Sequence, residues 1–285
     1  MVFYKGEQSV EYKIVSDSSS NVIEMGKVNY KAVPLKIICG DKEYVDTPEL
    51  DIDNMIEELK KTKNTSGTSC PNVYDWLEAY EGEKNIFAFS ISSSLSGSYT
   101  SAVCAKEKYI ETNPTANICV IDTLSTGPEM RLLMEKVEEC ADSGFSFEEI
   151  ENKIKDYQEN THVIFCVKSM NNLAKNGRIP MAFAKIALVL GIHVVGQGSD
   201  KGTLEPLHKC RGEQKSINTI YDVMLSNGFS GGKVRISHCQ NVESAKKLEK
   251  IIKSNYPKCD VFIEKCTALC SFYAEQGGLI IGYEG

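Results

Sequence analysis

The sequence is poor in the residues and patterns that mark several common kinds of protein. Its 285 residues include one tryptophan and four histidines, and none of its eleven cysteines form a Cys-x-x-Cys pair. An odd number of scattered cysteines argues against a disulfide framework and for the reducing interior of a cell. The closest cysteines, Cys266 and Cys270, have no histidine or further cysteine motif beside them. We therefore expect no zinc site.

Targeting and membrane signals are also missing. No apolar run approaches the roughly 20 residues that cross a bilayer, and residues 1–13 lack the apolar core of a signal peptide. The net charge is −7 and no basic patch stands out, which disfavours nucleic acid as a partner. We expect a cytoplasmic protein that binds no nucleic acid and does not insert stably into membranes.

What the chain does contain is a regular alternation of short apolar runs and amphipathic segments. Its 42% hydrophobic and 25% charged residues are ordinary globular values, and its length suits one large or two medium domains. In the first half, the spacing predicts strands over residues 12–16, 33–39, 44–46, 86–89 and 117–122. It predicts helices over residues 52–59, 73–80, 101–110, 130–141 and 147–159. Such alternation is typical of a parallel α/β sheet.

The pattern changes after about residue 160. Strands are predicted over residues 162–167, 192–195, 203–207, 234–238, 260–264 and 279–283, and helices over 171–178, 213–225 and 244–255. The apolar stretch 181–190 fits a core helix or the wall of an apolar pocket. We therefore predict an N-terminal α/β domain with a parallel sheet over residues 1–160. A C-terminal α/β domain with a more mixed sheet should occupy residues 161–285.

Four polar loops fall at strand ends, where ligands of open α/β sheets bind. They cover residues 17–21, 68–72, 92–98 and 122–127, and none contains lysine or arginine. Most serine-rich turns before helices are caps, but loop 92–98 holds more hydroxyls than one cap can use. Two or three neutral donors can hold a single carboxylate, whereas a phosphate site would usually need Mg²⁺ as well. The loops favour a carboxylate ligand.

A nucleophilic serine in this loop is the enzyme alternative. A hydrolase elbow needs flanking glycines and a histidine partner. No glycine flanks Ser92 or Ser93 in the sequence. No motif ties His162, His193, His208 or His238 to the loop. Asp17 and Asp122, at neighbouring strand ends, are the plausible metal carboxylates if the chain is a metal-dependent enzyme.

Several short motifs follow one another along nearly the whole chain. They are Val15-x-Asp17-Ser18-Ser19, Thr68-Ser69-Cys70-Pro71, Ser92-Ser93-x-Leu95-Ser96-Gly97-Ser98-Tyr99, Val120-Ile121-Asp122-Thr123, Leu173-x-Lys175-x-Gly177-Arg178-Ile179, Lys209-Cys210-Arg211-Gly212 and Gly277-Gly278-Leu279-x-x-Gly282-Tyr283. In sequence and in order, these motifs resemble those of the DegV family, the fatty-acid-binding proteins that serve as the FakB subunit of bacterial fatty acid kinase.

This resemblance implies a DegV-like fold with a long-chain fatty acid between the two domains. Its carboxylate would be held by hydroxyls matching Thr68 and Ser93, and the C-terminal domain would cover an apolar acyl tunnel. The neighbouring positions Ser69, Ser96 and Gly97 belong to the same loops. Tyr273 stands where the family often has a histidine, and its hydroxyl can donate a hydrogen bond.

The resemblance also implies a lipid-binding protein rather than an enzyme. The fatty acid would be its ligand, with no metal and no other cofactor. A separate kinase would phosphorylate the bound carboxylate to an acyl phosphate, and Arg211 matches a residue implicated in contact with that partner. Two alternatives stay open: an acyl hydrolase or other enzyme that uses the Ser92–Ser93 loop, and a carrier of a different lipid carboxylate.

Overall fold

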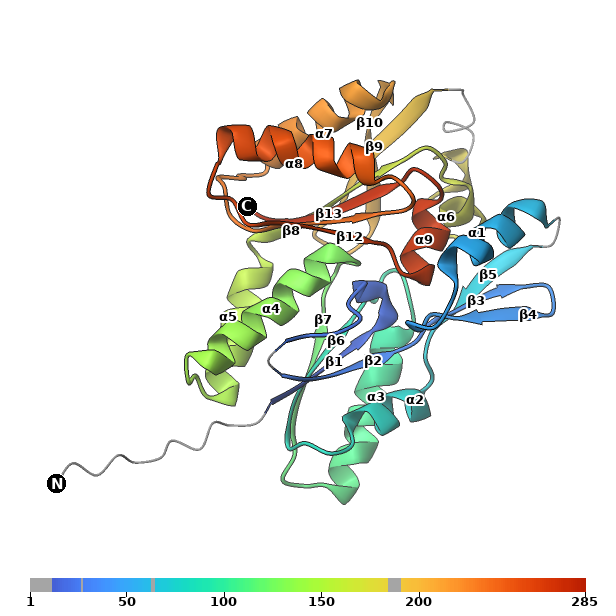
Figure 1. Cartoon of the computed structure of the whole chain (residues 1–285). Helices are drawn as coiled ribbons and strands as arrows, with labels where there is room; N and C mark the ends of the chain where they lie inside the picture. Colours follow the sequence, from blue (N-terminus) through green and yellow to red (C-terminus); the bar gives the residue numbers. More distant parts are fainter. Residues whose placement is uncertain (1–11, 27, 63–64, 184–190) are drawn as a thin grey trace.

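Two sheets, with one long helix between them, make up most of the molecule (Figure 1). The computed structural model describes residues 12–26, 28–62, 65–183 and 191–285. No helix in these ranges is long and apolar enough to cross a membrane.

The first sheet is parallel throughout and has the strand order β2-β1-β6-β7. Its strands are β1 (Tyr12–Asp17), β2 (Asn29–Val33), β6 (Asn85–Ser90) and β7 (Asn117–Asp122). Helices α2 (Val73–Tyr80) and α3 (Ser98–Thr112) cover one face, and α4 (Pro128–Asp142) and α5 (Phe147–Gln158) cover the other. Trp76 and Ala102 pack on the first face and Met130 and Ile150 on the second, all fully buried.

The second sheet is mixed and has the strand order β10-β9-β8-β13-β11-β12. Its strands are β8 (Thr161–Val167), β9 (Ile192–Gly198), β10 (Leu204–Arg211), β11 (Val234–His238), β12 (Val261–Lys265) and β13 (Leu279–Glu284). β11 and β12 pair in parallel, while the other neighbours are antiparallel. Helices α7 (Glu213–Ser226) and α8 (Val242–Asn255) cover the face seen at the top of Figure 1, and α4 contacts β13, β11 and β8.

A small antiparallel sheet stands beside the two large ones. It has the order β4-β3-β5 and consists of β3 (Lys36–Cys39), β4 (Lys42–Val45) and β5 (Ser66–Ser69). Near it lie α1 (Ile52–Lys61), α6 (Asn171–Lys175) and α9 (Ala268–Ala274). The described residues also include the 3-10 turns η1 (Ser18–Ser20) and η2 (Met181–Phe183).

The predicted fold class, an α/β protein with a parallel and then a mixed sheet, is confirmed. Several elements differ from the prediction, and three of these differences concern the small sheet and α9. The expected strand over 33–39 is interrupted at Pro34, because proline lacks the N–H that a ladder needs. Part of the expected loop 68–72 belongs to β5, and helix α9 was not predicted.

The predicted division at residues 160 and 161 stays a prediction. β7 is the last strand of the parallel sheet and β8 the first of the mixed sheet, but α4 packs against both. Of the predicted helix 181–190, residues 184–190 lie outside the described part of the chain.

Candidate functional site

An apolar cavity of about 70 Å³ lies where the small sheet, α9 and the mixed sheet meet the loop after β6. Most of its wall is aliphatic or aromatic, and a few polar groups interrupt it. The apolar lining comprises Leu35, Ile91, Leu95, Val163, Phe165, Val167, Leu173, Leu204, Leu269, Ala274 and Ile280. The remaining lining residues are Thr68, Ser96, Thr126, Arg178, Cys270 and Tyr273.

A pair of hydroxyls from distant parts of the chain faces this cavity. Thr68 Oγ1 and Tyr273 OH share a hydrogen bond of 2.7 Å, although 205 positions separate them. β5 pairs Thr68 with Ile37 of β3, and α9 carries Tyr273 from the other side. Burial raises the pKa of the Tyr273 hydroxyl above its usual value. Both hydroxyls are therefore neutral at neutral pH, and one of them donates to the other.

Arg178 places a positive charge at the cavity wall. Its Nε donates to the Leu95 carbonyl at 3.1 Å and its Nη1 donates to the Asn176 carbonyl, so the guanidinium is held in place. Leu95 belongs to the serine-rich loop and Arg178 follows α6. A guanidinium beside neutral hydroxyls suits a carboxylate, which accepts charge-assisted hydrogen bonds.

The hydroxyls of the serine-rich loop face in different directions. Ser96 lines the cavity. Ser92 and Ser94 donate to backbone carbonyls of the turn between β9 and β10. On either side of the loop, Ser90 at the end of β6 and Ser98 at the start of α3 donate to the buried carboxylate of Asp17, Ser98 at 2.7 Å.

Ser93 does not line the cavity. Its side chain is exposed, and its backbone N–H donates to Asp122 Oδ1 at 3.0 Å. The structure therefore brings Thr68 together with Ser96 and Tyr273 at the cavity, and not with Ser93.

The other predicted site residues lie outside the lining as well. The Ser69 hydroxyl makes a weak contact of 3.4 Å with the Cys70 carbonyl, and Gly97 is exposed near the Cys70 thiol. Arg211 is exposed at the end of β10, an edge strand of the mixed sheet.

The two carboxylates considered for a metal have structural partners instead. Asp17 is fully buried and accepts hydrogen bonds from three serine hydroxyls and the Ile91 N–H; burial raises its pKa while these bonds oppose the rise. Asp122 accepts from the backbone N–H groups of Ser93 and Leu124. Within the described ranges, no group of three or more histidine, cysteine or acidic side chains is placed to hold a metal.

The enzyme alternative needs a histidine near the serine loop, and the lining residues of the cavity include none. All four histidines lie in the described part of the chain, and none of them is among the lining residues. His193 Nδ1 lies 3.2 Å from the Ser216 hydroxyl, and the backbone N–H of Asn241 lies 3.3 Å from His238 Nδ1.

Arg178 is the site residue that reasoning from the polar loops missed. Those loops contain neither lysine nor arginine, and Arg178 follows a predicted short helix in the second half of the chain. The Gly177-Arg178-Ile179 motif was the signal that pointed to it, but the role of its charge could not be read from that motif.

Comparison with known proteins identifies relatives of this chain. A family profile described as an uncharacterised protein of the DegV family matches residues 11–284. A DegV domain-containing protein of Streptococcus pneumoniae is 40% identical over 277 residues, which make up 96% of this chain and 99% of that protein. The resemblance suggested by the motifs is confirmed.

Two solved structures are similar over nearly the whole chain. One is a DegV family protein from Eubacterium eligens loaded with heptadecanoic acid, and the other is the Streptococcus pneumoniae Fatty Acid Kinase (Fak) B3 protein loaded with linoleic acid. Each is 40% identical, has a TM-score of 0.94, and is matched over 96% of this chain and 99% of its own. Relatives with this fold therefore bind fatty acids.

Proposed function

Because this chain belongs to the DegV family, we propose that it binds a long-chain fatty acid in the apolar cavity. The observation that carries the proposal is the cavity's composition: an aliphatic wall that also bears Thr68, Ser96, Arg178 and Tyr273. A wall of this kind matches a ligand with a long apolar chain and one carboxylate. The fatty acids bound by two relatives of 40% identity support it.

The proposal assigns the carboxylate to Thr68, Ser96, Tyr273 and Arg178. Ser96 takes the place first expected for Ser93, because Ser96 lines the cavity and Ser93 is exposed. Hydrogen bonds to a charged group contribute about 1.5–3 kcal/mol each. The acyl chain gains about 0.8 kcal/mol per buried methylene, so the chain supplies most of the affinity.

Binding requires the cavity to widen. Its volume of about 70 Å³ is smaller than the engineered cavity of about 150 Å³ that admits a single benzene ring. A C16 chain is longer than benzene, so side chains of the cavity wall must move when the ligand enters. The proposed function thus includes a change of shape between empty and loaded protein.

We further propose that the chain presents the bound carboxylate to a separate kinase and does no chemistry itself. The name of the pneumococcal relative points to such a system. The exposed side chain of Arg211, on an edge strand, is available to a partner. A kinase would transfer the terminal phosphoryl group of a nucleoside triphosphate to a carboxylate oxygen, which would yield an acyl phosphate and release the nucleoside diphosphate.

Mass spectrometry of lipid extracted from the purified protein, followed by titration with palmitate and oleate, tests the proposal. We expect either a co-purified fatty acid in the extract or saturable binding of the added fatty acid. A different lipid carboxylate in the extract would support the carrier alternative. Absence of any bound lipid, together with no binding of either added fatty acid, would sink the proposed function.

Two arginine variants separate fatty-acid binding from presentation. Arg178→Gln should weaken palmitate binding by about 10- to 100-fold, because a charged donor to the carboxylate is lost. Arg211→Gln removes the same charge away from the cavity and should leave palmitate affinity unchanged. Its effect should appear in phosphorylation by the partner kinase.

A further inference from the structure

Two serines of the loop after β6 fasten the two parts of the molecule together beside the cavity. Ser92 Oγ donates to the Gly202 carbonyl and Ser94 Oγ donates to the Lys201 carbonyl, each at 2.7 Å. The serines follow a strand of the parallel sheet, and the carbonyls belong to the turn that joins β9 and β10 of the mixed sheet. We call these four residues the serine latch.

The turn fits closely against the serine loop. Gly202 is buried and has a φ of +71°, a conformation that favours glycine. A Cβ on Gly202 would lie 2.1 Å from Ser92 Oγ and 3.0 Å from Leu124 Cα. The turn is also stiff, since the Gly202 N–H donates to the Ser199 carbonyl and the Ser199 N–H to the Thr203 carbonyl, both at 2.8 Å. The latch therefore joins two ordered segments at one seam.

The seam forms a wall of the cavity. Ile91 and Leu95, which flank the latch serines, line the cavity, as does Leu204, which follows the turn. Clefts open on both sides of the turn. A polar cleft of about 550 Å³ shares Val163 with the cavity, and a groove of about 910 Å³ shares Leu204 and Arg178 with it. Parting the seam would connect the cavity to these open spaces.

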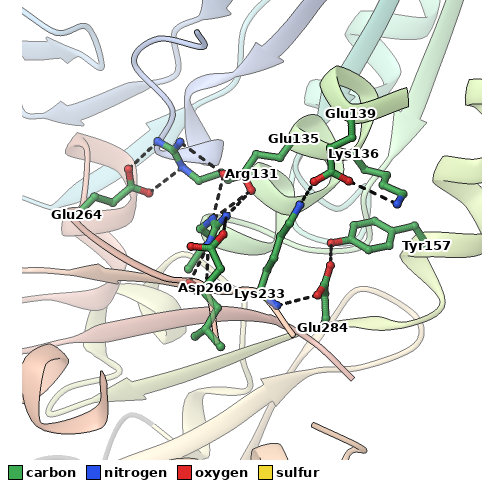
Figure 2. Close-up of polar contacts among 11 residues, drawn as sticks. Arg131, Glu135, Lys136, Glu139, Tyr157, Lys233, Asp260, Glu264 and Glu284 are labelled. Atoms are coloured by element: carbon green, nitrogen blue, oxygen red, sulfur yellow. Dashed lines mark hydrogen bonds and ion pairs between the residues drawn. The ribbon is translucent and has the colours of Figure 1, made fainter. Parts of the chain in front are cut away.

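The opposite side of the molecule is joined by charged contacts. Figure 2 shows α4 facing the ends of β11, β12 and β13 across a set of ion pairs. Arg131 of α4 pairs with Glu264 at 2.7 Å, and Glu135 of α4 pairs with Arg235 at 2.8 Å. Lys233 pairs with Glu139 of the same helix. Arg235 is almost fully buried, and charged hydrogen bonds of this kind are stronger than neutral ones.

We propose that the serine latch is the place where the fatty acid enters and leaves. The seam is held by two neutral hydroxyl-to-carbonyl bonds, and the α4 side by several charged ones. When the molecule opens, the turn parts from Ser92 and Ser94 while α4 stays attached to the mixed sheet. Ser92 and Ser94 are positioning residues, and neither touches the ligand. The inference rests on the proposed fatty-acid binding.

Loss of the latch should change the rates of binding in a way that loss of a ligand contact would not. The latch stabilises the closed state equally with and without fatty acid. Its loss should therefore raise the association and dissociation rates by the same factor and leave the affinity unchanged. A residue that touches the carboxylate would instead change the dissociation rate and the affinity, with little effect on association.

Stopped-flow exchange of a fluorescent C16 fatty acid tests the inference. For the Ser92→Ala, Ser94→Ala double variant we expect both rate constants to rise about 10-fold, with an unchanged Kd. Ser94→Ala alone, at an exposed position, should raise both by a smaller factor. Gly202→Ala keeps both hydroxyls but forces the turn away, and should act in the same direction.

Two variants serve as controls. Ser96→Ala makes the same chemical change inside the cavity. It should raise Kd by increasing the dissociation rate alone. Arg131→Gln, on the α4 side, should lower the unfolding temperature and leave both exchange rates as they are.

Unchanged exchange rates in all three latch variants would overturn the inference. A higher Kd with an unchanged association rate would overturn it as well. Either result needs a wild-type protein that binds the fluorescent fatty acid. If the wild type does not bind it, the proposed function fails instead.

Discussion

At the scale of single residues, the proposed carboxylate site consists of three hydroxyls and one guanidinium, those of Thr68, Ser96, Tyr273 and Arg178. Burial raises the pKa of Tyr273, and arginine stays protonated in proteins. Thr68 and Ser96 do not ionise. Where the family often has a histidine, this chain has a tyrosine whose hydroxyl bonds to Thr68. Fatty-acid affinity should therefore be almost flat between about pH 6 and pH 9.

Tyr273→His should give this binding a pH dependence. An imidazolium beside the carboxylate strengthens binding at low pH, and the gain is lost as pH rises through the histidine pKa of about 6.5. Isothermal titration with palmitate from about pH 5.5 to pH 8.5 measures it. Tyr273→Phe is the matched control: it loses the hydroxyl bond to Thr68 and should bind more weakly with a flat profile. A flat profile in the histidine variant would contradict the placement of position 273 beside the carboxylate.

Glu129 makes folding stability depend on pH. Its side chain is 6% exposed and accepts hydrogen bonds from Ser125 and, at 2.9 Å, from Thr161. Burial raises its pKa from 4.5 to about 7, although both hydroxyls oppose the rise. Between these values the folded protein keeps a proton that the unfolded chain has lost. The free energy of unfolding therefore falls as pH rises through this window, by about 3 kcal/mol in all.

Glu129→Gln should remove that fall, because a glutamine can bond to both hydroxyls without ionising. We expect the variant to exceed the wild type in stability above about pH 7 and to approach it near pH 5. Urea unfolding at a series of pH values measures the difference, and Glu111→Gln on the exposed face of α3 is the control. A difference that stays constant with pH would rule out titration at position 129.

Single residues also show what could not be predicted from the sequence. The motifs located two loops that border the cavity, since Thr68 and Ser96 both line it. They could not tell which hydroxyl faces inward, because the direction of a side chain in a turn depends on backbone angles that composition does not fix. Ser93 and Ser96 are three positions apart in one loop, yet one is exposed and the other lines the cavity.

At the scale of elements, a buried carboxylate holds α9 in place. Asp46 is 5% exposed and follows β4. It accepts hydrogen bonds from the first two N–H groups of α9, Ala268 at 2.7 Å and Leu269 at 3.1 Å. It thus caps a helix that starts more than 200 positions later in the chain. α9 carries Leu269 and Tyr273 to the cavity.

Asp46→Ala should lower the free energy of unfolding by about 2–4 kcal/mol, because buried N–H groups lose their acceptor. It should also weaken palmitate binding through the displacement of α9. Asp51→Ala removes a similar but exposed cap, the bond to the Asn54 N–H of α1, and should cost about 1 kcal/mol. Urea unfolding and palmitate titration of both variants provide the comparison. Equal losses would show that the Asp46 contacts are no more than a surface cap.

Elements with a clear period were predictable, and elements fixed by distant contacts were not. The period of 3.6 residues located α1 and α2 within a few positions. β5 has the sequence Ser66-Gly67-Thr68-Ser69, which is typical of a loop, and it is a strand because β3 supplies its hydrogen bonds. α9 is buried nearly all round and so shows no amphipathic pattern, and its cap comes from Asp46 in a different part of the sequence.

At the scale of the whole molecule, α4 belongs to both sheets. Met130 and Leu133 pack with the core of the parallel sheet, while Arg131 and Glu135 form ion pairs with the mixed sheet (Figure 2). At its start the helix backbone comes so close to β13 that a Cβ on Gly282 would lie 2.3 Å from the Glu129 nitrogen. A glycine is required there. Neither sheet can lose its structure without exposing a face of this helix, so the two should unfold together.

The single tryptophan makes this prediction testable. Trp76 is fully buried in α2, so its fluorescence reports unfolding of the parallel sheet alone, whereas far-UV circular dichroism reports both sheets. We expect the two thermal curves of the wild type to share one midpoint, as in a cooperative transition.

Removing the ion pairs should separate the two signals. The Arg131→Ala, Arg235→Ala double variant leaves Glu135 and Glu264 without their arginines, and losing charged hydrogen bonds at these partly buried positions costs about 1.5–3 kcal/mol each. The mixed sheet should then lose its tie to α4 first, so that circular dichroism changes before fluorescence. Lys253→Ala breaks an exposed pair with Glu249 and should leave the curves coincident. Two midpoints in the wild type would show that α4 does not couple the sheets. α4 would then not hold the mixed sheet in place while the serine latch opens.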